Sequence, residues 1–298
     1  MTHVIAVLHG GWSFLRLAPE SRPPAHQSSY EENPQINPAN QSPEKPRNII
    51  NLMTRMLLVG ESWVSVSTHY KGFNHFVSGV YETGLKWFSE AMDRHGIELT
   101  HMPAHEAAND FPFTVDGLNY DVIILSDIGA DSFLLHPKTW LHGERTPNRL
   151  KTIKEYVERG GGLIMAGGYM SFQGINGAAM YQRTPIADVL PVKIMASDDR
   201  CERPEGVKPR KTMEHMITEG FPERWPHLLG YQLVEPKEMA QTLAVVDDDP
   251  LLVVGGHGKG RCIAYMTDIG PHWCPSEFAE WNGYGLLWKN MIEWASGA

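Results

Sequence analysis

The stretch GGGLIMAGGYMSFQG, residues 160–174, decides the fold of this chain. Its centre, residues 163–166, is a short apolar run between glycines, which is typical of a strand that is buried on both faces. Apolar side chains recur at helical spacing just before it, and Gly160 stands where that helix would end. Helix, glycine stop, buried strand and a second glycine cluster together make one unit of a parallel α/β sheet.

The turn at residues 167–171 follows this strand and is the place where we expect a functional site. In open parallel sheets, ligands bind outside the carboxyl ends of the strands. A sharp turn from a strand into a helix also lifts its central side chain above the sheet and points backbone N–H groups at an anion. We therefore expect Gly168, Tyr169 and Ser171 to contact a substrate.

Other apolar runs predict the rest of the sheet. Continuous runs at 56–60, 97–102 and 121–126 predict three more buried strands, and this pattern indicates a parallel sheet with right-handed crossovers. Runs at 242–246, 251–254 and 261–267 predict three strands near the C-terminus, the last two forming an antiparallel hairpin through a glycine-rich turn. Between these two groups, residues 196–241 are polar and predict an excursion over the sheet edge.

Helical spacing predicts two amphipathic helices and one short helix. The first helix would carry five apolar positions and end at residues 95–96, and the segment 65–71 before it is expected to be a polar, aromatic loop. Residues 184–191 predict a short helix that Pro191 ends. A last amphipathic helix would close the chain. The apolar positions of the first and last helices are Val77, Tyr81, Leu85, Phe88 and Met92, and Tyr284, Leu287, Met291 and Trp294.

Residues 1–52 differ in composition from the remainder. Between 21 and 47 the chain is rich in Pro, Asn, Gln, Ser and Glu and has almost nothing to bury, so it cannot offset its ordering entropy. We expect a disordered leader at 1–52 and one globular domain at 53–298. The alternative is that translation starts at Met53 or Met56.

Composition excludes several classes of partner. The net charge is -9 and no basic stripe is present, which argues against binding to a nucleic-acid backbone. No apolar run reaches the roughly 18–20 residues that span a bilayer, so we expect no membrane association. The 3 Cys form no C-x-x-C pair, a usage that fits the cytoplasm. The glycines at 255–260 lack the order of a phosphate loop, and we expect no cofactor.

Polar and aromatic residues follow several of the predicted strands and should converge at one edge of the sheet. Asp268 and His272 are the candidate catalytic acid/base pair, because imidazole titrates near neutrality. The alternative is that Asp268 caps a turn and His272 packs beside its neighbours. With Glu61 beside them at the end of the first strand, the further residues expected to bind a small polar substrate are Ser62, Trp63, Asp127 and Trp273.

A metal site is an alternative for some of these residues. His69, His75, Asp127 and His272 are suitable ligand types, but their spacing matches no metal signature. We therefore expect no metal.

The chain resembles the class I glutamine amidotransferase-like superfamily, and within it the branch of putative glutamine amidotransferases related to trehalose-utilisation proteins. Three segments carry the resemblance, at 167–174, 184–192 and 250–275, and it extends over residues 56–296. It implies a flavodoxin-like domain with helices on both faces of a mostly parallel sheet, here with an antiparallel C-terminal extension. It also implies a homodimer.

The chain departs from the active members of that superfamily at the turn. Glutaminases of this kind carry Cys there, with His and Glu close together near the C-terminus, whereas this chain has Gly167, Gly168 and Tyr169 and no His-x-Glu pair. Sugar-utilisation relatives place His near the turn, and this chain does not. Without a thiolate, attack on a glutamine amide has no nucleophile.

Three functions stay open from the sequence. The first is a cytoplasmic metabolic enzyme that acts on a small polar, sugar-derived substrate through Asp268 and His272, as a hydrolase or lyase. The second is a non-catalytic ligand-binding or assembly domain. The third is an amidotransferase with a non-standard nucleophile, for which Cys274 beside His272 is the candidate.

Overall fold

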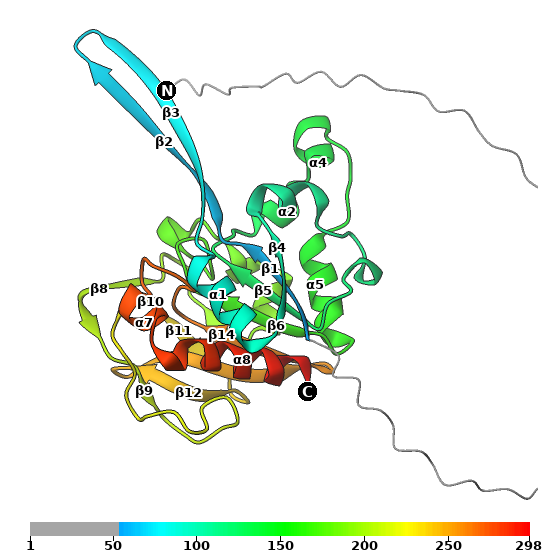
Figure 1. Ribbon diagram of the computed structural model, residues 1–298. Helices are drawn as coiled ribbons and strands as arrows, with labels where there is room; N and C mark the ends of the chain where they lie inside the picture. Colours follow the sequence, from blue (N-terminus) through cyan, green and yellow to red (C-terminus); the bar gives the residue numbers. More distant parts are fainter. Residues whose placement is uncertain (1–53) are drawn as a thin grey trace, which may run out of the picture. The chain divides into compact units, whose positions relative to one another are not determined.

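The computed structural model describes residues 54–298, and the leader expected at 1–52 lies outside them. Their centre is one eight-stranded sheet with the strand order β4-β1-β5-β6-β14-β13-β12-β9 (Figure 1). Its first five strands are parallel: β1 (Arg55–Gly60), β4 (Glu98–Met102), β5 (Val122–Ser126), β6 (Gly162–Ala166) and β14 (Gly260–Tyr265). Counted along the chain, they stand in the order 2-1-3-4-5, which is the flavodoxin-like order. The predicted fold class is confirmed.

The remaining strands extend the sheet in the antiparallel sense. β13 (Asp249–His257) pairs with β14, β12 (Gln241–Val246) with β13, and β9 (Arg210–Lys211) with β12. The polar segment 196–241 thus lies at the sheet edge, as expected. It contributes to two small two-stranded sheets, which are β8 (Arg200–Val207) with β10 (Leu228–Gln232) and β7 (Val192–Ile194) with β11 (Val234–Pro236).

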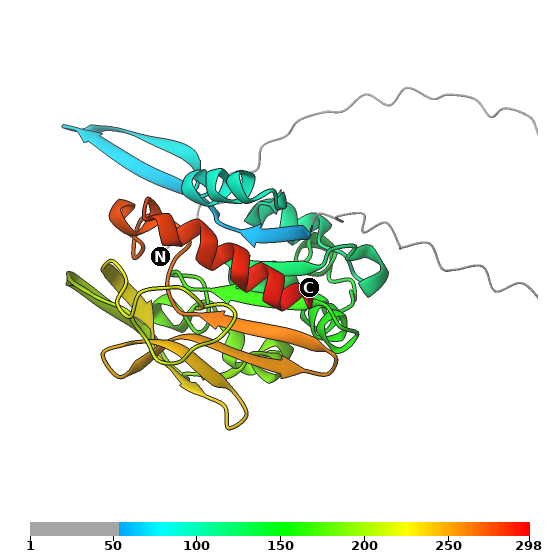
Figure 2. The ribbon, with the colours of Figure 1, turned by 60° about the horizontal axis from the view of Figure 1, so that its bottom comes forward.

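Helices cover both faces of the parallel strands. α1 (Lys86–His95) and α8 (Asn282–Ser296) contact each other over one face (Figures 1 and 2). α5 (Arg149–Glu158) lies on the other, because a Cβ on Gly162 would meet α8 whereas one on Gly260, which points the opposite way, would meet α5. The shorter helices are α2 (Ala104–Asp110), α3 (Asp131–Leu134), α4 (Pro137–His142), α6 (Pro185–Val189) and α7 (Ser276–Ala279), with 3-10 turns at Val115–Gly117, Ile175–Gly177 and Tyr181–Arg183. Within residues 54–298, no helix is both long and apolar enough to cross a membrane.

The prediction for residues 65–81 is wrong. The segment expected to be a loop is β2 (Ser62–Lys71), and Val77 and Tyr81 lie in its partner β3 (Asn74–Thr83) and not in the helix. Side chains four residues apart share a face in a helix and in a strand alike, so the spacing of Val77 and Tyr81 could not separate the two. The helix itself begins at Lys86 and ends at His95, and Gly96 after it adopts the left-handed conformation.

A buried arginine ties three helices together behind the sheet. The Arg149 guanidinium donates to the carbonyl oxygens of Ala107 at the end of α2 and of Phe133 in α3, at 2.9 and 2.8 Å. It also donates to the carbonyls of Ala108 and Ser132. The Ala107 carbonyl also accepts from the Phe111 N–H, so the other three carbonyls are the ones that depend on this side chain.

We predict that Arg149→Met destabilises the protein by at least about 3 kcal/mol, because buried carbonyls would lose their donors. Urea unfolding followed by circular dichroism measures the change. The matched control is Lys151→Met on the exposed side of the same helix, which should stay within about 0.5 kcal/mol of wild type. Equal stability of the two variants would contradict this role for Arg149.

Candidate functional site

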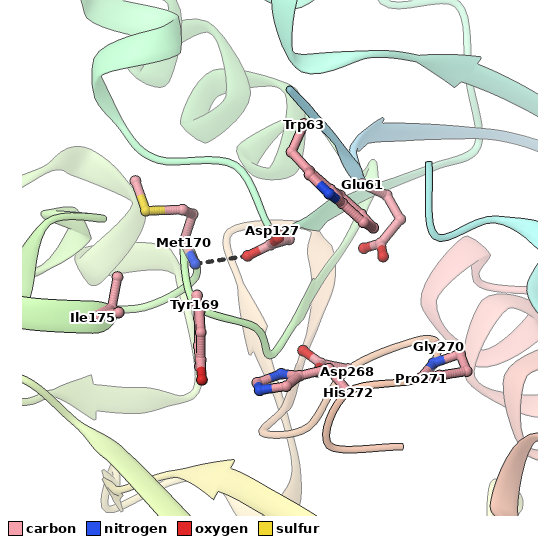
Figure 3. Close-up of a pocket in the computed structure, with 10 residues that line it drawn as sticks. All are labelled: Glu61, Trp63, Asp127, Tyr169, Met170, Ile175, Asp268, Gly270, Pro271 and His272. Atoms are coloured by element: carbon pink, nitrogen blue, oxygen red, sulfur yellow. Dashed lines mark hydrogen bonds and ion pairs between the residues drawn. The ribbon is translucent and has the colours of Figure 1, made fainter. Parts of the chain in front are cut away.

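A cavity of about 390 Å³ lies at the carboxyl ends of the parallel strands (Figure 3). Its position follows from the register, which aligns the strand ends: Gly60 pairs with Ser126, and Ala166 with Tyr265. The residues after β1, β5, β6 and β14 therefore meet. The cavity is lined by Glu61, Trp63, Asp127, Tyr169, Met170, Ile175, Asp268, Gly270, Pro271 and His272.

Asp268 and His272 form a hydrogen-bonded pair on the cavity wall. The His272 Nδ1 lies 2.9 Å from the Asp268 Oδ2, and the backbone N–H of Trp273 donates to that same oxygen at 2.9 Å. Burial lowers the pKa of His272, but the hydrogen bond to Asp268 and the nearby carboxylates outweigh it and raise the pKa above its ordinary value. Since Asp268 engages Nδ1, Nε2 is the nitrogen that can exchange a proton with a ligand.

Glu61 is a third acidic group in the cavity. The sequence predicts Glu61 at the end of the first strand, without a role in binding or catalysis. It is buried, its backbone adopts φ 48°, and its carboxylate accepts a hydrogen bond from the Ser126 hydroxyl at 2.6 Å. Burial, with the neighbouring Asp127, raises its pKa to about 8. The signal for its role was an acidic residue directly after a buried strand.

Asp127 is held by the turn after β6. Its Oδ1 accepts from the Met170 N–H at 2.7 Å, and its own N–H donates to the Ser171 hydroxyl at 3.1 Å. Burial raises the pKa of this carboxyl, against the lowering effect of the Met170 N–H. Ser171, expected to bind substrate, is buried and instead positions Asp127.

The turn itself differs from the expected one. No α-helix begins directly after it, and several of its N–H groups are already occupied by carboxylates of the chain. Besides the Met170 N–H on Asp127, the Gln173 and Gly174 N–H groups donate to Asp199, each at 2.8 Å. Gly168 has φ 133°, and a Cβ there would stand 2.9 Å from Asp268 and 3.0 Å from Asp127. Glycine at this position lets the two carboxyls approach.

Aromatic side chains complete the wall, with one change from the prediction. The Tyr169 ring packs edge-on against His272 at 4.3 Å, with the Arg200 guanidinium 5.1 Å from its centre. Trp63 also lines the cavity. Trp273 is fully buried, stacks on His272 at 5.3 Å and donates from Nε1 to Glu202, so it supports the wall from behind.

The other expected residues lie away from the cavity. Ser62 accepts a hydrogen bond from the Ala104 N–H and does not line it. His69 and His75 lie on the exposed β2–β3 hairpin, whereas Asp127 and His272 line the cavity. Among residues 54–298, no group of three or more His, Cys, Asp and Glu side chains could hold a metal ion. Cys274 is fully buried, and burial raises its pKa well above the ordinary thiol value.

We predict that Glu61→Gln changes how stability depends on pH. A raised pKa means that the folded protein holds the proton more tightly than the unfolded chain does. This stabilisation is complete below the unfolded value of 4.5 and is lost as the pH rises towards 8. The introduced amide cannot ionise, and its oxygen can still accept a hydrogen bond from Ser126. The free energy of unfolding of the variant should therefore rise relative to that of wild type by at most about 1.4 kcal/mol for each pH unit in this window. Urea unfolding across the window measures the gain, and parallel curves would contradict the assignment.

Comparison with known proteins agrees with the fold. A family model described as "Putative glutamine amidotransferase" matches residues 55–297. Two solved structures from Salmonella typhimurium, each described as a cytoplasmic protein, are 41% identical to the chain with a TM-score of 0.78. The first match covers 80% of this chain and 98% of the relative, and the second, from strain LT2, covers 81% and 99%.

More distant likeness is structural. A ThuA-like protein from Parabacteroides merdae is 14% identical, with a TM-score of 0.49 over 82% of this chain and 90% of its own. No curated protein sequence matches the chain. On the family model and the two Salmonella relatives together, the chain belongs to the glutamine amidotransferase-like family.

Proposed function

We propose that the protein is a cytoplasmic metabolic enzyme that acts on a small polar substrate by acid/base catalysis in this cavity, as a hydrolase or lyase. The observation that carries the proposal is the Asp268–His272 pair, with its free imidazole nitrogen on a cavity wall that also holds Glu61 and Asp127. Acid/base catalysis needs a proton donor whose pKa lies near the working pH. The raised pKa of His272 supports the role of donor near neutrality.

The cavity chemistry supports a ligand with hydroxyl groups. Glu61, with a pKa of about 8, is protonated at neutral pH, so it can both donate to and accept from a hydroxyl. Trp63 and Tyr169 supply aromatic faces of the kind that sugar rings pack against. A sugar-derived polyol or hydroxy acid fits this combination of groups.

The geometry does not favour a standard glutaminase reaction. None of the ten residues that line the cavity is a cysteine. Cys274, the one candidate for a non-standard nucleophile, is a buried thiol whose raised pKa disfavours the thiolate that attack requires.

The description of the two Salmonella relatives agrees with the cytoplasmic location expected from cysteine usage.

We predict that a thermal-shift screen of sugars, sugar acids and polyols finds a stabilising ligand, since binding to the folded state raises the melting temperature. For the substrate found in this way, His272→Gln should lower kcat by at least about 100-fold, because the proton donor is lost. Asp268→Asn should lower kcat as well. Binding, measured by calorimetry, should persist in both variants.

Two controls separate the alternatives. His257→Gln changes the last residue of β13, which pairs with Glu158 beside the start of β14, at the end of the sheet opposite the cavity, and it should leave kcat unchanged. Cys274→Ala should also retain turnover. Ammonia release from glutamine that Cys274→Ala abolishes would instead show an amidotransferase. A tightly bound ligand that is never turned over would show a binding domain.

A further inference from the structure

The β2–β3 hairpin is a long arm that leaves the body of the protein at the cavity. We call residues 62–83 the arm; its two strands pair with each other over ten residues and project away from the sheet (Figures 1 and 2). They form a separate two-stranded sheet. An isolated two-stranded hairpin is marginally stable in water, so an arm of this length needs a surface to pack on.

The two faces of the arm differ in chemistry. Opposed residues share a face, and the pairs Val64–Tyr81, Val66–Gly79, Thr68–Val77 and Tyr70–His75 therefore form one side. We call this side the apolar face. Its large apolar side chains are between 49% and 77% exposed: Val64, Val66, Tyr70, Val77 and Tyr81. The opposite side is mixed: Trp63, Phe76 and Val80 alternate there with serines and with Lys71 and Glu82, which are the Lys and Glu of the whole arm.

A second exposed apolar patch lies on the segment after β5. Leu135, Trp140 and Leu141, at the end of α3 and in α4, are 40%, 67% and 67% exposed. We call these three residues the α4 patch. β1 leads into the arm and β5 leads towards α3, and the two strands are parallel neighbours, so both features leave the same edge of the sheet. In the single chain both remain uncovered.

We propose that a second copy of this chain covers the arm, with the apolar face of each arm packing on the α4 patch of the other copy. Each chain carries both the apolar face and the α4 patch. In a two-fold dimer the same contact therefore forms twice, once from each arm to the patch of the other copy. Two copies of a chain with a net charge of -9 repel each other unless their contact surface carries little charge. The arm is nearly uncharged, so it brings no like charges together in the contact.

The exposed area is sufficient for a stable contact. Each copy contributes both an apolar face and an α4 patch, so eight large side chains of each copy, between 40% and 77% exposed, would enter the two contacts: Val64, Val66, Tyr70, Val77 and Tyr81 with Leu135, Trp140 and Leu141. With about 200 Å² for each aromatic side chain, their exposed area approaches the roughly 800 Å² per partner that a standard interface buries. The base of the arm also lines the cavity through Trp63, on the side opposite the apolar face.

Light scattering on the full chain tests the oligomeric state. We expect wild type to be a dimer at micromolar concentration, and Val66→Asp and Trp140→Asp to be monomers, because each buries a charge in the contact. The matched controls are Ser67→Asp, on the other side of the same strand, and His142→Asp, beside the α4 patch; both should remain dimers. Since Val66 and Trp140 are exposed, melting temperatures should show that all four variants fold.

Photo-crosslinking identifies the occupant. A photoreactive amino acid in place of Tyr70 should link to the peptide that contains Trp140 of a second, isotope-labelled copy. Links to residues 1–53 of the same chain would overturn the proposal in favour of the leader as occupant. A monomeric wild type, or a dimer that Val66→Asp leaves intact, would overturn it as well.

Discussion

The register of the parallel sheet is the constraint on which the site depends. Four adjacent strands, β1, β5, β6 and β14, end at the same level, so the segments that follow them share one small space. Glu61 directly follows β1, and Asp127 directly follows β5. Both have positive φ, which turns the chain sharply and keeps the carboxyls at the strand ends. Slippage of one strand by a residue would turn its side chains to the opposite face and disperse the group.

The chemistry of the site follows from this crowding. Carboxyls that are removed from water and brought close to one another resist ionisation, and the raised pKa values of Glu61 and Asp127 express both effects. Burial lowers the pKa of His272, but the hydrogen bond to Asp268 and the charges of Asp268, Glu202 and Asp127 outweigh it and favour a positive charge on the imidazole. Gly168 permits the arrangement because it has no Cβ to fill the space between Asp127 and Asp268. The turn that holds a nucleophile in glutaminases here binds the Asp127 carboxylate through the Met170 N–H, and its Ser171 hydroxyl accepts from the Asp127 backbone N–H.

Sequence patterns predicted the buried strands, because burial leaves a continuous run of apolar residues in the chain. Continuous apolar runs identified β5 and β6, and the edge where their ends meet gave the position of the cavity. The sequence could not predict features that depend on the direction in which a side chain points. Val77 and Tyr81 have the same spacing on a strand as on a helix, and nothing in the sequence shows that Trp273 turns inward to Glu202. The raised pKa of Glu61 comes from its burial beside Asp127. That neighbourhood can be predicted only once the order of the strands in the sheet is known.

The protonation of His272 is the most direct test of the proposed acid/base pair with Asp268. Nitrogen-15 NMR of the histidine side chains, recorded over a pH titration, measures the pKa of His272 in the folded protein. We expect a pKa above the ordinary 6.5, with Nδ1 protonated towards Asp268, and a fall in this pKa in Asp268→Asn. A His272 pKa at or below 6.5 that Asp268→Asn leaves unchanged would contradict the proposed acid/base pair.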